Sequence, residues 1–455
     1  MALDKSDLQR IINLIKNKDF KEALEKANAL SKSNENDEVL ANIISIIYRR
    51  LGKYEKAEYW ANKAIGLKED FWAAINNKAN IFHERGDILS SLQLFRSLID
   101  RNPGYVEARV NYALALKSSG DYLGALTEYK KIQEIKVYDL GIFHIAITML
   151  SLGIFKEGWE KHEYRWKVDP LNKTKWPIEG RPLWEGKRGS DIVIWREQGI
   201  GDELIFLGLV PEACALSKSV SVYVDKRLIP LCERSMPDVR FLSDPKQISE
   251  QEFDCHLPMG SLPRLFRSSE EDFKKTVKGY LKADANRVEV LRQELNVGDR
   301  KIIGISWKSI KSLNQLKKSL TLMEFGKIFQ DLDIVLLNLQ YGEVGEEIKA
   351  FEKDTGIEII QCSSVDNRED LDGLAALIEL CDLVVSTSNV TIHLAGALGK
   401  NTWVLLPYVA NFWWLLERTD SVWYPSLTLY RQKTLKDWDS VALDLKEDLK
   451  KKFNK

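Results

Sequence analysis

The sequence has few of the residues that would mark a secreted, membrane or metal-binding protein. Its 5 cysteines form no Cys-x-x-Cys pair, so neither a disulfide framework nor a zinc site is indicated. No apolar run approaches the roughly 18 residues that a membrane helix needs, and no signal-peptide pattern follows Met1. The net charge of −1 indicates no basic surface for nucleic acid or for an anionic membrane. These absences predict a cytoplasmic protein with no nucleic-acid partner and no membrane span.

Two common nucleotide motifs are also missing. No Gly-x-x-x-x-Gly-Lys phosphate loop occurs, which argues against a kinase or an ATPase. Gly199-x-Gly201 lacks the third glycine of a dinucleotide fingerprint, so a nicotinamide cofactor is not favoured. At 455 residues the chain is long enough for two or three domains.

What the sequence does contain is a repeat in its first third. Gly52, Gly86 and Gly120 are 34 residues apart, and matching turns occur near Lys18 and Gly153. A small residue follows each turn at a fixed offset, namely Ala23, Ala57, Ser91, Ala125 and Gly158. The pattern resembles the tetratricopeptide repeat (TPR), in which such residues let two antiparallel helices pack closely. Residues 1–170 are therefore predicted to form a TPR α-solenoid.

The function of these repeats has two interpretations. Stacked repeats generate concave surfaces, which favours a groove for a protein or peptide over a rigid spacer or a dimerisation surface. The groove candidates on the first helices of the repeats are Tyr48, Asn76, Asn77, Asn80, Asn111 and Tyr112. The same residues could equally be solvated or inter-helix positions.

From residue 191 onward, short apolar runs alternate with helical patterns. Expected strands lie at 192–195, 219–224, 240–242 and 254–257, with a helix expected at 203–216 after the first of them. After a helix at 285–295, further strands are expected at 301–307, 334–337, 357–360, 383–385 and 402–406. This alternation implies parallel, doubly wound sheets that bind ligands at the carboxyl ends of their strands. The predicted domains are 191–285 and 286–438, preceded by a rigid Trp- and Pro-bearing connector at 171–190. A terminal helix within 439–455 could cross back to the first sheet.

The strongest local signal for a ligand site lies at 384–407, which reads as strand, loop, helix and strand. Ser388 and Asn389 precede Thr391, His393 and Gly396 at helical spacing. Small polar residues at a helix start leave backbone N–H groups and the positive helix end free for an anion. A basic, hydroxyl-rich loop follows the expected strand 301–307 at the same sheet edge, and the two together suit a diphosphate. Taken alone, that loop would be a solvated lysine run.

The segments at 197–202 and 393–399 resemble those of glycosyltransferases of the B fold (GT-B). The similarity extends to 158–159, 280–284 and 423–425, and it is closest to bacterial TPR glycosyltransferases related to the heptosyltransferases. Some of these modify flagellin, and the protein O-GlcNAc transferases are more distantly similar. The resemblance implies an α + α/β fold, with an N-terminal TPR α-solenoid followed by two Rossmann-like domains. It further implies an inverting, metal-independent glycosyltransferase with no cofactor besides its nucleotide-sugar donor.

The resemblance also implies roles for individual residues. Asp202 occupies the position of the family's catalytic aspartate, and an N-cap is the alternative role for it. Nucleotide-sugar binding is implied for Gln198, Gly199, Gly201, Ser306, Lys308, Lys318, Ser319, Ser388, Asn389, Val390, Thr391, His393 and Gly396. Ser388 departs from the family pattern, which usually has an acid there, and Asn389 replaces the usual threonine. For His393 the alternative is a buried core histidine. The Asp-x-Asp sequences at 331–333 and 437–439 resemble the metal-binding motif of other glycosyltransferases. They lie in turn-like segments away from the predicted site, so they are given little weight.

The acceptor is the least constrained part of the prediction. A protein side chain recognised by the TPR groove is favoured. The alternatives are a glycan or lipid-linked acceptor, or a catalytically degenerate TPR scaffold that only binds partners. Ser388 keeps the scaffold interpretation open, because the family usually has an acidic residue at that position.

Overall fold

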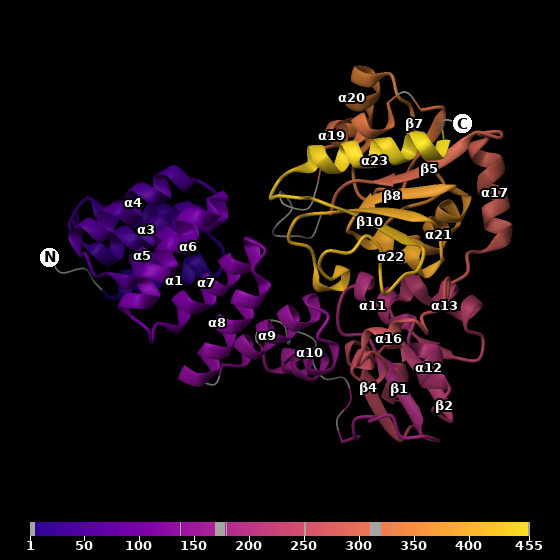
Figure 1. Ribbon diagram of the computed structural model, residues 1–455, viewed down its shortest axis with the longest axis horizontal. Helices are drawn as coiled ribbons and strands as arrows, with labels where there is room; N and C mark the ends of the chain where they lie inside the picture. Colours follow the sequence, from indigo (N-terminus) through magenta and orange to yellow (C-terminus); the bar gives the residue numbers. More distant parts are fainter. Residues whose placement is uncertain are drawn as a thin grey trace. The chain divides into compact units, whose positions relative to one another are not determined.

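The computed structural model describes residues 5–136, 138–168, 178, 180–249, 252–309, 320–330 and 332–453. The chain forms two compact units, Met1–Thr148 and Met149–Lys455. The first unit is helical, and the second contains two sheets of parallel strands (Figure 1). Within the described ranges, none of the helices has the length and apolar character required to span a membrane. The finer division of the chain into five segments stays a prediction.

The first unit is a TPR-like solenoid of paired helices. Its helices are α1 (Lys5–Lys16), α2 (Phe20–Ser31), α3 (Glu38–Arg50), α4 (Tyr54–Leu67), α5 (Trp72–Arg85), α6 (Ile88–Arg101), α7 (Val106–Ser118) and α8 (Tyr122–Ile135). Helix α9 (Asp139–Ser151) begins in the first unit and continues past its last residue, Thr148. Gly52, Gly86 and Gly120 adopt positive φ angles of 71°, 99° and 90° in the turns within three pairs. Lys18 has a φ of 67° at the matching turn of the first pair. Because positive φ favours glycine, this turn is the strained member of the series.

The predicted small residues lie where the helices of a pair approach each other. Ala23, Ala57, Ser91 and Ala125 have no exposed surface. The fifth, Gly158, belongs to the second unit, where an added Cβ would lie 2.8 Å from Leu150 Cδ2. The spacing in the sequence therefore identified a real packing constraint.

Asparagines connect consecutive repeats of the first unit. Asn77 Nδ2 donates to Asn42 Oδ1 at 3.2 Å and to Ser45 Oγ at 2.8 Å, and Asn111 Nδ2 donates to Asn76 Oδ1 at 3.1 Å. Asn76 and Asn77 are each only 4% exposed. Among the groove candidates, these two are therefore inter-helix residues, and the half-buried positions are Tyr48, Asn80, Asn111 and Tyr112.

The second unit contains a four-stranded sheet and a six-stranded sheet. The strands are β1 (Asp191–Trp195), β2 (Ser219–Tyr223), β3 (Arg240–Leu242) and β4 (Cys255–Pro258), then β5 (Lys301–Ser306), β6 (Ile334–Asn338), β7 (Ile359–Ile360), β8 (Leu383–Thr387), β9 (Thr402–Leu406) and β10 (Leu427–Arg431). Their orders are β3-β2-β1-β4 and β10-β9-β8-β5-β6-β7, and all neighbouring strands pair in parallel. The prediction of parallel α/β sheets is confirmed.

Helices cover both sheets. They are α10 (Phe155–His162), α11 (Ile200–Leu207), α12 (Val210–Cys214), α13 (Ile229–Ser235), α14 (Lys246–Ser249), α15 (Leu262–Phe266), α16 (Glu270–Phe273), α17 (Ala285–Leu295), α19 (Leu322–Gly326), α20 (Gly345–Thr355), α21 (Leu371–Leu380), α22 (Val390–Ala397) and α23 (Trp438–Phe453). Short 3-10 turns accompany them, namely η1 (Glu163–Lys167), η2 (Lys226–Leu228), η3 (Met259–Ser261), η4 (Lys327–Phe329) and η5 (Phe412–Trp414).

Three local expectations differ from the structure. The helix expected to run from Glu203 to residue 216 is two helices, α11 and α12, because Gly208 and Pro211 interrupt the pattern. The edge strand β10 was not predicted. The terminal helix α23 packs its Leu445 and Leu449 into the core of the second sheet, so it does not cross back to the first.

A cluster of aromatic residues joins the two sheets within the second unit. Trp413 stacks on Trp159 of α10, with ring centroids 6.0 Å apart, and meets Phe206 of α11 edge-on at 5.5 Å. Trp423 meets Phe273 at 4.9 Å. The tryptophans near the carboxyl terminus therefore fill the core between the sheets.

Candidate functional site

The strand orders locate the two sheet edges where a ligand is most readily bound. In the first sheet the order reverses between β1 and β4, and in the second it reverses between β5 and β8. Ligands of doubly wound sheets bind outside the carboxyl ends of the strands at such reversals. The predicted site residues follow β1, β5 and β8. Helices α11 and α22, which follow β1 and β8, contact each other (Figure 1).

A buried ion pair holds the loop after β1. Arg165 of η1 donates to both oxygens of Glu197, at 2.8 Å each. Glu197 Oε1 also accepts from the backbone N–H of Gly260 at 2.8 Å, and both side chains are at most 5% exposed. An arginine–carboxylate fork of this kind fixes geometry as well as charge. The ion pair anchors the loop whose last residues, Gln198 and Gly199, precede α11. Gln198 is half-buried and Gly199 is exposed.

Helix α11 begins with Gly199 as its cap and carries Asp202 in its first turn. The Asp202 carboxylate accepts a hydrogen bond from the backbone N–H of Gly199 at 3.3 Å. The side chain is therefore not the N-cap, although it reaches back to the cap residue. Burial raises the pKa of Asp202 to about 6, while the Gly199 bond and a hydrogen bond from Trp413 oppose that rise. Its partly buried carboxylate is thus poised to exchange a proton close to neutral pH.

Helix α22 begins at Asn389, whose side chain is almost completely enclosed. Asn389 Oδ1 caps the helix by accepting from Thr391 N at 3.0 Å, and Nδ2 donates to Ser306 Oγ at 2.7 Å. These bonds tie the end of β5 to the start of α22. Ser306 and Thr391 are at most 1% exposed, so their hydroxyls organise the site from within. Of the helix-start residues, Ser388 and Val390 are half-buried rather than enclosed.

Gln340 is a second organiser that sequence reasoning missed. Its Oε1 accepts from Ser306 Oγ at 3.1 Å, Trp307 N at 3.0 Å and Lys308 N at 2.9 Å. A glutamine after a predicted strand gives little signal in the sequence, since its partners lie more than 30 residues away. It shapes the turn that follows β5.

Lys308 has an acidic partner in this structure. Its Nζ forms an ion pair with Glu347 of α20, and the same glutamate accepts from Trp307 Nε1 at 3.0 Å. Any phosphate that Lys308 binds must therefore compete with Glu347. The remaining loop candidates, Lys318 and Ser319, lie outside the described residues.

His393 lies where the two helix starts meet. A Cβ added to Gly201 of α11 would lie 3.1 Å from His393 Cδ2 and 3.7 Å from Nε2. The imidazole stacks on Trp414, with centroids 5.5 Å apart and planes inclined by 18°. Burial lowers the pKa of His393 to about 3, so the ring is neutral at pH 7. The structure thus brings Gly201 and His393 together from opposite sheets.

Two of the predicted site residues, Ser388 and Gly396, lie in direct contact with aromatic side chains. The hydroxyl of Ser388 accepts a hydrogen bond from Trp414 Nε1 at 3.0 Å. Gly396 lies against the ring of Tyr424, since an added Cβ would come within 2.6 Å of it. Gly396 is therefore a packing requirement, and Ser388 takes part in positioning Trp414 over His393.

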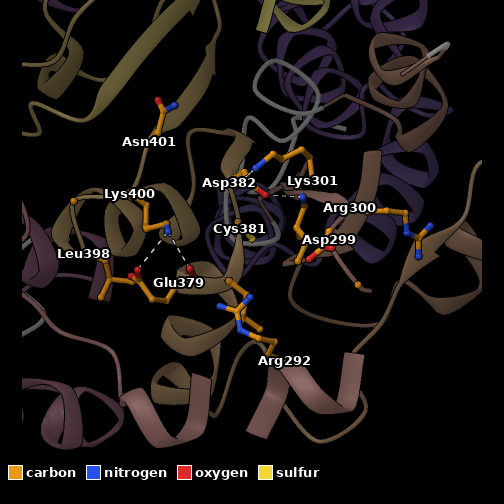
Figure 2. A pocket seen from close by; sticks show the side chains of 14 residues that line it. Arg292, Asp299, Arg300, Lys301, Glu379, Cys381, Asp382, Leu398, Lys400 and Asn401 are labelled. Atoms are coloured by element: carbon orange, nitrogen blue, oxygen red, sulfur yellow. Dashed lines mark hydrogen bonds and ion pairs between the residues drawn. The ribbon is translucent and has the colours of Figure 1, made fainter. Parts of the chain in front are cut away.

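A separate hollow of ≈ 600 Å³ lies at the opposite edge of the second sheet, beside the starts of β5, β8 and β9 (Figure 2). Its lysines already have partners. Lys301 pairs with Asp382 at 2.8 Å, and Lys400 Nζ donates to Glu379 O at 2.9 Å. None of the predicted site residues within the described ranges lines this hollow.

The chain is similar in sequence to a known bacterial protein. No protein-family model matches the chain. The chain is 29% identical to Protein FlbA of Caulobacter vibrioides over 423 residues, which cover 88% of this chain and 70% of FlbA. The similarity therefore includes both units.

Solved TPR structures match the chain over about a third of its length. A thermophilic TPR protein of Thermus thermophilus is 15% identical, covers 36% of this chain and 91% of its own, and has a TM-score of 0.34. MamA from Desulfovibrio magneticus is 15% identical, covers 38% of this chain and 96% of its own, and has a TM-score of 0.30.

Proposed function

We propose that the chain is an inverting glycosyltransferase of the GT-B fold that transfers a sugar from a nucleotide-sugar donor. The observation that carries this proposal is the meeting of two helix starts at the reversal points of two parallel sheets, one of them bearing Asp202 with a pKa of about 6. The proposed acceptor is a protein side chain that the TPR repeats recognise.

In the proposed reaction, the Asp202 carboxylate accepts the proton of an acceptor hydroxyl. The acceptor oxygen then forms a bond to the anomeric carbon as the bond to the nucleoside diphosphate breaks, with inversion at that carbon. The departing diphosphate is stabilised by backbone N–H groups at the start of α22. Asn389 supports this role because it holds the helix start rigidly against β5.

The first test measures thermal stability of the full chain with UDP, ADP, GDP and CMP, and with their sugar conjugates. A ligand present at 100 times its dissociation constant stabilises the folded state by about 2.7 kcal/mol, which gives a visible shift. We expect one nucleotide class to raise the melting temperature. If no nucleotide does so, the degenerate scaffold becomes the better interpretation.

The second test separates binding from chemistry. Asp202→Asn should retain the nucleotide-dependent shift and lose sugar transfer, because the amide keeps the shape and cannot accept the proton. Glu271→Gln is the matched control, since Glu271 is an exposed carboxylate on α16 whose ion-pair partner Lys274 is also exposed. Undiminished transfer by Asp202→Asn would remove Asp202 as the base.

A further inference from the structure

Three basic residues occupy equivalent positions in consecutive repeats of the first unit. Arg49, His83 and Lys117 are spaced by 34 residues, and each lies shortly before the glycine of its turn. They belong to the last turns of α3, α5 and α7, the first helices of their pairs. These helices contact one another in order, α3 with α5 and α5 with α7. The three residues therefore form one series along the helices that are expected to line the groove.

The first two members of this series are bonded to the next first helix. Arg49 Nη1 forms an ion pair with Glu84, and His83 Nε2 lies 2.8 Å from Ser118 Oγ. In both cases the partner lies 35 residues further along the chain. The asparagine bonds between consecutive repeats have the same separation. A separation of 35 residues therefore marks side chains that face each other on adjacent first helices.

Lys117, the third member, lacks such a partner. The residue 35 positions after it is Leu152, whose side chain has no hydrogen-bond acceptor. Within the described residues, no hydrogen bond or ion pair joins the Lys117 ammonium to another group. Its Nζ lies 5.6 Å from the centroid of the Tyr122 ring. Among the described parts of the first unit, the series thus ends on an unpaired cation.

Lys117 is also half-buried, which distinguishes it from an ordinary surface lysine. Burial lowers the pKa of its ammonium to about 8, so the group is still mostly protonated at pH 7. A shielded ammonium without a carboxylate has lost hydration that no ion pair replaces, and the ring of Tyr122 offsets only part of that loss. A carboxylate supplied by a ligand is therefore favoured at this position.

The first helices of the repeats carry more basic than acidic residues. The basic residues of α3, α5 and α7 are Arg49, Arg50, Lys78, Arg85, Arg109 and Lys117, and the acidic ones are Glu38, Glu84 and Glu107. Arg85 and Arg109 pair with glutamates of second helices. Arg50, Lys78 and Lys117 have no acidic partner in the described segments. Because unpaired cations favour a partner of opposite charge, this face suits an acidic segment.

We propose that Lys117 binds a side-chain carboxylate from an acidic segment of the protein that the repeats recognise. A carboxylate oxygen accepts a hydrogen bond from Nζ, which gives Lys117 the kind of partner that Arg49 has in Glu84. The inference deepens the proposed function, because it states the chemistry of the partner. It rests on that function only for the partner being the acceptor of a sugar.

The first experiment asks whether the fold needs the ammonium. Lys117→Met keeps an unbranched side chain beside the ring of Tyr122 and removes the charge. We expect circular-dichroism melting of the full chain to show an unchanged or higher melting temperature, because no ion pair is lost. Arg49→Met is the comparison, since it leaves Glu84 without its cation and should lower the melting temperature by about 2–8 °C. A fall of about 2 °C or more in Lys117→Met would overturn the proposal, because Lys117 would then act within the fold.

The second experiment measures peptide binding by the full chain. The probes are two short rhodamine-labelled peptides, one that alternates glutamate with serine and one in which glutamine replaces each glutamate. We expect fluorescence anisotropy to show tighter binding of the glutamate peptide. Lys117→Met should weaken that binding about tenfold, as for the loss of one charge-assisted hydrogen bond, and should leave the glutamine peptide unaffected. Lys117→Arg should retain most of the affinity, because a guanidinium also donates to a carboxylate.

Lys68→Met is the matched control for the peptide experiment. Lys68 is exposed, its Nζ lies 6.0 Å from the centroid of the Phe71 ring, and no acidic group of the described residues pairs with it. We expect this variant to bind the glutamate peptide as the wild type does. Absence of binding to the glutamate peptide, equal binding of the two peptides, or an equal loss in Lys68→Met would each overturn the proposal.

These outcomes are separate from those of the nucleotide experiments. A nucleotide-dependent shift without peptide binding would retain the proposed transferase and remove the acidic partner. Peptide binding that depends on Lys117, without a shift by any nucleotide, would retain the acidic partner and assign it to a scaffold.

Discussion

The starts of α11 and α22 are built alike in the sequence and differently in the structure. Each is an eight-residue helix that follows a buried strand at a reversal point of its sheet. The α11 start has a glycine cap and a partly buried carboxylate, Asp202. The α22 start has an enclosed asparagine cap with neutral partners on both sides.

Under the proposed function, this difference gives the two sheets different tasks. A carboxylate whose pKa lies at about 6 can exchange a proton near neutral pH, which suits the helix start that is proposed to carry the base. A helix start held by neutral, buried hydrogen bonds keeps its backbone N–H groups in place, which suits binding. The loop before α11 is fixed instead by the charged pair of Arg165 and Glu197.

The largest effect should come from removing the carboxylate. We expect Asp202→Asn to lower kcat by about 10²- to 10⁴-fold, the range typical for loss of a general base. The stability of the variant at pH 7 should not fall, because burial already disfavours the charged form of Asp202. Steady-state kinetics and thermal unfolding measure the two quantities, and a comparable loss of both would mean that Asp202 acts through the fold.

The next largest effect should come from breaking the charged pair before α11. Arg165→Leu leaves the buried carboxylate of Glu197 without its cation, which typically costs about 3–5 kcal/mol. Tryptophan fluorescence during denaturant unfolding would report it, since Trp60 and Trp72 alone of the 13 tryptophans lie in the first unit. Arg165→Leu combined with Glu197→Gln should recover part of the loss, and equal losses in both variants would contradict this explanation.

A smaller loss is expected at the neutral helix start. Asn389→Ala removes the cap of α22 and one partner of Ser306, which should cost about 1–3 kcal/mol. Asn389→Asp is the matched variant, because it keeps the cap oxygen and loses the donor to Ser306. We expect Asp to be less damaging than Ala in the same unfolding experiment, and the reverse order would mean that the amide donor dominates.

The smallest effect concerns pH. Because the reactive form of Asp202 is the carboxylate, kcat/KM should fall tenfold per pH unit below about 6. The folded pKa is raised above the ordinary value of 3.8, so the unfolding free energy should decrease as pH rises from about 4 through 6.

Trp413→Phe tests what sets the pKa of Asp202. The substitution removes a hydrogen bond that favours the charged form of Asp202, so we expect the acid limb of the kcat/KM–pH profile to move to higher pH. An unmoved limb would separate Trp413 from the titration of Asp202.

Regular features of the chain could be predicted from the sequence because they arise from local periodicity. The 34-residue spacing of Gly52, Gly86 and Gly120 reflects backbone angles that each turn requires locally. Strands such as β5 and β9 are continuous apolar runs, as expected for strands covered on both faces. The edge strand β10 alternates apolar with polar residues and was missed, since it has a neighbouring strand on one side only.

The sequence by itself determined the repeats, the parallel sheets and the residues at the strand ends, because these follow from spacing and side-chain type. Only the tertiary structure decided how those residues are used. It paired Arg165 with Glu197 and Lys308 with Glu347, enclosed Asn389, and set Trp414 over His393. These contacts join segments far apart in the chain, so their effects on charge and exposure arise from packing and have no local signature.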